Sequence, residues 1–124
     1  NVAKRTLPLA RERDLGVIAK RPIANAAWRT GTRPENSYHQ AYWDRLQALN
    51  YDFLSGSIAQ GVEIALRFTV YLPGVHTAIV GTANPERWAE NACLLERGPL
   101  SPEQFNAIRS RWQDVSQGHW GGET

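Results

Sequence analysis

Residues 77–91 read TAIVGTANPERWAEN, a short apolar run followed by the signals of a helix start. The run at 77–80 is rich in β-branched residues and is bounded by Pro73-Gly74 on one side and Gly81 on the other. Such a run between turn residues is typical of a strand buried on both faces. We therefore expect a strand that ends at Gly81.

A helix is expected to begin within a few residues of this strand. Asn84 is a favourable N-cap, Pro85 suits the first helical position because its φ is preset and its N–H is absent, and Glu86 complements the helix dipole. A helix N-terminus presents unpaired N–H groups and partial positive charge, which favour an anion. Arg87 adds a planar donor suited to a phosphate. The spacing also fits an ordinary strand-to-helix turn without a ligand.

The rest of the chain shows the same kinds of signal. A helix at residues 7–14, stopped by Gly16, precedes a short buried strand at 17–19. A loop with Gly31 and Pro34 follows at 29–36. Apolar spacing and capping boxes then predict helices at 38–49, from Ser57 to about residue 70, from Asn84 to Gly98, and from Ser101 onward.

Alternation of strands with helices predicts an α/β fold made of parallel β/α units. A complete (β/α)8 TIM barrel takes about 250 residues, whereas this chain has 124. We therefore expect residues 1–124 to form a single segment that is part of such a barrel. Its strand edges would need a cover, either from another copy or from the missing portion.

Composition narrows the possible functions. A formal charge of +2 is too small to indicate nucleic acid or an anionic membrane as partner. No stretch approaches the roughly 20 apolar residues of a membrane span, and the first residues lack a signal-peptide core. Cys93 is the single cysteine, which excludes an intrachain disulfide and fits a reducing cytoplasm; its neighbours Ala89 and Ala92 predict a buried position. The three histidines have no ligand spacing, so no metal site is expected.

The pattern Gly81-Thr82-x-Asn84-Pro85-Glu86-Arg87-x-x-Glu90-Asn91 resembles the segment after the eighth strand of the aldo-keto reductases. In that family this segment holds the adenosine 2′-phosphate and the adenine of NADP(H). Residues 15–22, Leu-Gly-Val-Ile-Ala-Lys-Arg-Pro, resemble the seventh strand and the loop that lies along the cofactor. The resemblance continues through residues 96–100 and covers nearly the whole chain, but it is to the C-terminal part of the barrel.

The resemblance implies a set of cofactor-binding residues. Thr82 and Asn84 fall where the family contacts the 2′-phosphate, and Gly81 stands where many members have a lysine. Arg87 falls at the adenosine end. The adenine is implied to contact Glu90 and Asn91, and the pyrophosphate the loop of Arg21, Pro22, Ile23, Ala24 and Asn25. Without the resemblance, the sequence favours equally a contact of Lys20 or Arg21 with the pyrophosphate and a pair of side chains that face solvent after the strand.

The resemblance implies the NADP(H)-binding portion of an oxidoreductase acting on carbonyl or alcohol substrates. The family's Asp, Tyr, Lys and His tetrad has no matching motif here, so no catalytic residue is assigned and the isolated chain is expected to be inactive. Its expected partners are the cofactor and either further copies of itself or the missing N-terminal half-barrel. The alternative is a non-catalytic, self-associating β/α module with a vestigial anion site.

Overall fold

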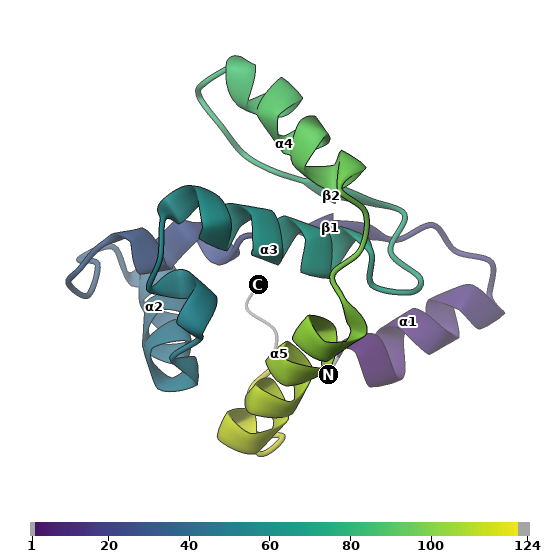
Figure 1. The fold of residues 1–124 in the computed structure, drawn as a ribbon. Coiled ribbons are helices and arrows are strands. Elements are labelled where there is room, and N and C mark those ends of the chain that lie inside the picture. The colour runs from purple at the N-terminus through teal and green to yellow at the C-terminus, as the bar shows by residue number, and fades with distance from the viewer. Residues whose placement is uncertain (1, 122–124) are drawn as a thin grey trace.

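The computed structural model describes residues 2–121. In that range the chain forms five α-helices, two strands and two short 3-10 helices (Figure 1). Their order is α1 (Val2–Glu12), β1 (Ile18–Lys20), η1 (Ala24–Arg29), α2 (Ser37–Leu49), η2 (Asp52–Leu54), α3 (Ile58–Val70), β2 (Thr77–Ile79), α4 (Glu86–Glu96) and α5 (Pro102–Ser116).

The two strands pair in parallel, as the β/α alternation predicts. Ile18 lies opposite Thr77, Ala19 opposite Ala78, and Lys20 opposite Ile79. His76 reinforces the start of this pair, because its Nδ1 accepts a hydrogen bond from the backbone N–H of Val17 at 3.0 Å. The described part of the chain is thus mostly helical with a parallel sheet of two strands, which is consistent with part of the expected α/β fold.

The expectations that the strand at 77–80 is buried on both faces and that the strand at 17–19 is buried are wrong. Side chains alternate along a strand, so Ile18 and Ile79 share one face of the sheet and Ala19 and Ala78 the other. Each isoleucine is 59% exposed, whereas the two alanines are half-buried. Helix α3 contacts β2, but no strand of residues 2–121 curls round to cover the isoleucine face. That face therefore meets water.

The helix caps show how local sequence positions these elements. Ser57 and Ser101 accept the N–H groups of Gln60 and Gln104, each at 3.2 Å, which confirms both predicted capping boxes as N-caps. Helix α1 does not end through Gly16 as expected. Instead Asp14 adopts a left-handed φ of 52°, and the N–H of Leu15 reaches the carbonyl of Ala10 at 2.8 Å. This is a Schellman ending, and a short polar residue such as aspartate tolerates it.

The hydrophobic core lies among the helices. Leu7 of α1 and Leu66 of α3 are almost completely buried, and Phe68 of α3 stacks on Phe105 of α5 with ring centroids 5.2 Å apart. Tyr51 donates its hydroxyl to the carbonyl of Ile108 at 3.0 Å. Burial raises the pKa of Tyr51 to about 12, against the opposing charge of Arg111. The phenol therefore keeps its proton and this bond at neutral pH.

Helix α4 is the least buried part of the fold. It lies against α3 on the opposite side from α5 (Figure 1) and has no buried residue. Cys93 is exposed on it, so the expected burial of this cysteine is wrong. None of the helices in the described residues is long and apolar enough to cross a membrane.

A network of polar contacts ties the end of α4 to α3. Arg67 donates to the carbonyls of Gly98 and Pro99, at 2.8 and 2.9 Å, and pairs with Glu63 at 2.7 Å. Arg97 reaches the same carboxylate at 2.7 Å. Partial burial alone would raise the pKa of Glu63, but the hydrogen bonds from Arg97 and Arg67 outweigh it and hold that pKa below its ordinary value.

Candidate functional site

The two segments singled out from the sequence leave the same edge of the sheet. Because β1 and β2 are parallel and Lys20 lies opposite Ile79, the loop at 21–25 and the junction at 81–85 both start at the carboxyl ends of neighbouring strands. In parallel α/β folds this is the edge at which ligands bind. The fold therefore brings together two segments that are about 60 residues apart in the sequence.

The junction after β2 is organised by Thr82 and Asn84. The hydroxyl of Thr82 accepts the N–H of Asn84 at 3.1 Å, and the Asn84 side-chain oxygen accepts the N–H of Glu86 at 3.0 Å. Asn84 thus accepts the first N–H group of α4, as predicted, although the helix begins at Glu86, two residues after it. Pro85 already has helical angles (φ −63°, ψ −27°), as expected for the first position of the helix. Residues 81–90 are all exposed, so this helix start is open to a ligand.

Arg87 lies in the first turn of α4 and forms an ion pair within that helix. Its guanidinium pairs with the Glu90 carboxylate at 3.0 Å, and both side chains are 52% exposed. An exposed pair of this kind contributes about 0–1 kcal/mol. A phosphate could therefore draw Arg87 away from Glu90 at little cost. Asn91 is half-buried on the same helix.

The loop after β1 has an unusual backbone. Arg21 has a φ of 57°, and the consecutive residues Ala24, Asn25 and Ala26 have φ values of 44°, 56° and 49°. Two turns hold the loop, from the N–H of Ala24 to the carbonyl of Arg21 and from the N–H of Ala26 to that of Ile23, at 2.9 and 2.7 Å. Left-handed backbone costs roughly 1–2 kcal/mol per non-glycine residue. Four of the six residues at 21–26 adopt this backbone conformation, so contacts with the rest of the fold hold the loop in it.

Two side chains of this loop have polar groups suited to an anion. Arg21 donates from Nη1 to the hydroxyl of Tyr42 at 2.8 Å, and its Cζ lies 4.6 Å from the ring centre of Tyr38. The hydrogen bond with Tyr42 raises the pKa of Arg21 above its ordinary value, so the guanidinium stays charged. The side-chain amide nitrogen of Asn25 is buried and has no hydrogen-bond partner among residues 2–121. Such a donor is costly to leave unsatisfied.

Sequence reasoning did not identify Tyr38 and Tyr42 as part of this site. Both residues lie in the helix predicted at 38–49, and the sequence assigned them no further role. The two tyrosines are four residues apart and so lie on one face of the helix, which is the signal that could have revealed a paired role. Pro22 is buried, and Ile23 and Ala24 are half-buried, so these three residues shape the loop through packing.

Among the residues that the structure describes, no three His, Cys, Asp or Glu side chains lie close enough to hold a metal ion.

Comparison with protein families shows to which family the chain is related. The family model described as the Aldo/keto reductase family matches residues 1–113 of the 124. The chain belongs to the aldo/keto reductase family. Searches of curated proteins and of solved structures find no match. Membership confirms the resemblance seen in the sequence and gives the chain an oxidoreductase-like domain of a family whose fold is the TIM barrel. The two parallel strands and their helices are consistent with part of that fold.

Proposed function

We propose that this chain is the NADP(H)-binding portion of an aldo-keto reductase-like oxidoreductase acting on carbonyl or alcohol substrates, and that it corresponds to the C-terminal part of the barrel. The observation that supports this most directly is the common edge from which the loops after β1 and β2 depart in a chain of this family. When bound, the cofactor would supply or accept the hydride.

The residues at this edge fit the anionic parts of such a cofactor. Thr82 and Asn84 stand at the N-terminus of α4, where the helix dipole favours a phosphate. Arg87 would leave Glu90 and pair with the adenosine end, next to Glu90 and Asn91. On the other loop, the charged Arg21 and the unsatisfied amide of Asn25 suit a pyrophosphate. Gly81 leaves space, since a side chain placed there would meet no atom within 4 Å.

Carbonyl reduction also requires a general acid at the substrate oxygen. We assign no residue of this chain to that role and infer that it comes from the N-terminal half-barrel. The isolated chain is therefore expected to show no reductase activity toward aldehydes, with NADPH oxidation as the measurement. Steady oxidation that survives repurification would contradict this division of roles.

Arg87→Ala is the direct test of the proposed cofactor contact. Loss of a charge-assisted hydrogen bond costs about 1.5–3 kcal/mol, which weakens NADPH binding roughly tenfold or more. The expected result in an NADPH titration followed by calorimetry is this loss, with Arg5→Ala on the exposed face of α1 as a control that leaves affinity unchanged. Equal affinity before and after Arg87→Ala would remove Arg87 from the site.

A second candidate function is a non-catalytic β/α module that associates with itself and keeps the anion site only as structure. The exposed face that carries Ile18 and Ile79, beside Thr77 and Lys20, favours this candidate, because exposed isoleucines of this kind are commonly covered by a partner. The two candidates differ in a simple mixing experiment. The reductase portion should yield activity when combined with an N-terminal half-barrel of the family, whereas the module should assemble without it and show none.

A further inference from the structure

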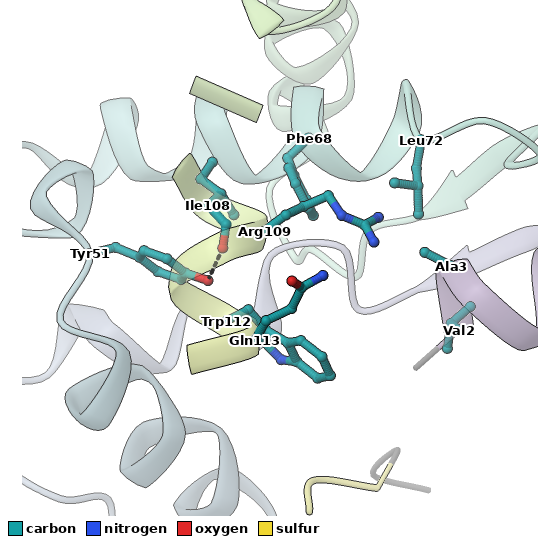
Figure 2. A pocket seen from close by; sticks show the side chains of 9 residues that line it. All are labelled: Val2, Ala3, Tyr51, Phe68, Leu72, Ile108, Arg109, Trp112 and Gln113. Atoms are coloured by element: carbon teal, nitrogen blue, oxygen red, sulfur yellow. Dashed lines mark hydrogen bonds between the residues drawn. The ribbon is translucent and has the colours of Figure 1, made fainter. Parts of the chain in front are cut away.

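A cavity of about 260 Å³, partly open to solvent, lies between α1, α3 and α5 (Figure 2). Most of its lining is aliphatic or aromatic, and the Tyr51 hydroxyl is already directed to the carbonyl of Ile108. Arg109 supplies the only formal charge among its described lining residues. The lining consists of Val2, Ala3, Tyr51, Phe68, Leu72, Ile108, Arg109, Trp112 and Gln113.

The size of the cavity suits a small ligand. An apolar cavity of about 150 Å³ can bind benzene, and pockets for drug-sized ligands start at roughly 300 Å³. A volume between these values suits a molecule of about ten non-hydrogen atoms.

Arg109 places a positive charge beside the apolar lining of the cavity. Its guanidinium extends toward Leu72 and Ala3 (Figure 2) and lies 5.7 Å from the ring centre of Phe105. A neighbouring hollow of about 210 Å³ shares Ala3, Leu72 and Arg109 with the cavity and is also lined by Arg11. Neither arginine takes part in an ion pair within residues 2–121. Arg109 thus lines the apolar cavity and Arg11 lines the adjoining hollow, and no carboxylate of residues 2–121 pairs with either.

From this combination we propose a binding site for a small apolar carboxylate, an aliphatic or aryl acid. The tail would occupy the cavity beside Phe68 and Trp112, and the carboxylate would pair with Arg109, with Arg11 on its far side. Guanidinium groups match carboxylates in geometry and charge. Each buried methylene of the tail would raise affinity about fourfold. None of the residues proposed to hold the cofactor lines this cavity, but an adjoining hollow shares Tyr51, Phe68, Ile108 and Trp112 with it and extends to Pro22, Ile23 and Ala24.

The test uses the full chain, with octanoate as the probe and octan-1-ol as its uncharged counterpart. Calorimetry, together with tryptophan fluorescence, to which Trp112 of the cavity contributes, is expected to show that octanoate binds at least tenfold more tightly than octanol. Arg109→Met keeps the apolar stem and removes the charge. It should weaken octanoate about tenfold and leave octanol unchanged, whereas Arg13→Met, at an exposed arginine outside both hollows, should change neither.

Ala3→Phe tests the cavity itself. Ala3 is half-buried and lines both hollows, so a phenyl ring there would fill the space and should abolish binding of both probes. Far-UV circular dichroism would show that the helices are retained. Octanoate binding that survives Ala3→Phe, or that is equal in the native chain and in Arg109→Met, would overturn the proposal. The Arg109→Met result decides it even where Ala3→Phe unfolds the chain.

Discussion

Leu66→Ala is expected to lower the free energy of unfolding by about 2–5 kcal/mol, the usual cost of emptying a fully buried leucine site. Leu66 is 1% exposed and lies in α3, the helix that contacts β2 on one side and α4 and α5 through its other faces. A domain of this kind has about 5–15 kcal/mol of stability in total. The variant should therefore lose a large fraction of its stability.

Urea unfolding followed by circular dichroism measures this loss, with Ile58→Ala as the matched control. Ile58 lies in the same helix but is 54% exposed, so its truncation should change the free energy of unfolding by less than about 1 kcal/mol. Similar losses in the two variants would place the core elsewhere than among α1, α3 and α5.

Self-association is the second large effect that we expect. At low micromolar concentration the native chain should sediment as a homodimer or larger assembly, because Ile18 and Ile79 are each 59% exposed on one face of a sheet with two open edges. Burying one such side chain contributes about 1.5–3 kcal/mol, or roughly tenfold or more in dissociation constant. The double variant with Ile18→Asp and Ile79→Asp should therefore shift the chain toward monomer.

The control for this experiment places the same charges elsewhere. Leu9 and Ile58 are also exposed, at 46% and 54%, but neither belongs to the sheet, so Leu9→Asp with Ile58→Asp should leave the assembly intact. A compact native monomer whose unfolding does not depend on concentration would show that the chain closes its edges in another way. The proposal that it forms part of a barrel would then fail.

Local signals predicted the parts of the fold that depend on neighbouring residues. Asn84, Ser57 and Ser101 cap helices as expected, because a cap involves only groups within three positions of it. The parallel pairing of β1 and β2 followed from the β/α alternation. The burial of the strand faces could not be predicted in this way. A run of apolar residues does not indicate whether the segment that covers it belongs to the same chain.

The loop after β1 shows the limit of such reasoning. Ala24 and Ala26 carry no sequence signal for left-handed backbone, yet both adopt it. Ala26 and Ala27 are buried, at 9% and 5% exposure, so packing imposes this conformation on the loop. The contact of Arg21 with Tyr42 is likewise tertiary and joins residues 21 positions apart. The sequence therefore pointed to the loop and the junction as candidate segments, but it gave no indication that Tyr38 and Tyr42 contact Arg21.

The exposed position of α4 has a consequence for how the domain moves. This helix carries Arg87, Glu90 and Asn91, buries no side chain, and is anchored at its far end by the contacts of Arg67 and Arg97 with Glu63 and the following carbonyls. Segments with few buried contacts open at a lower free energy than the rest of a domain. The amide hydrogens of α4 should therefore exchange with solvent sooner than those of α3. An anion bound at the N-terminus of α4 would slow that exchange. The exchange rate of the α4 amides would therefore report whether the site is occupied.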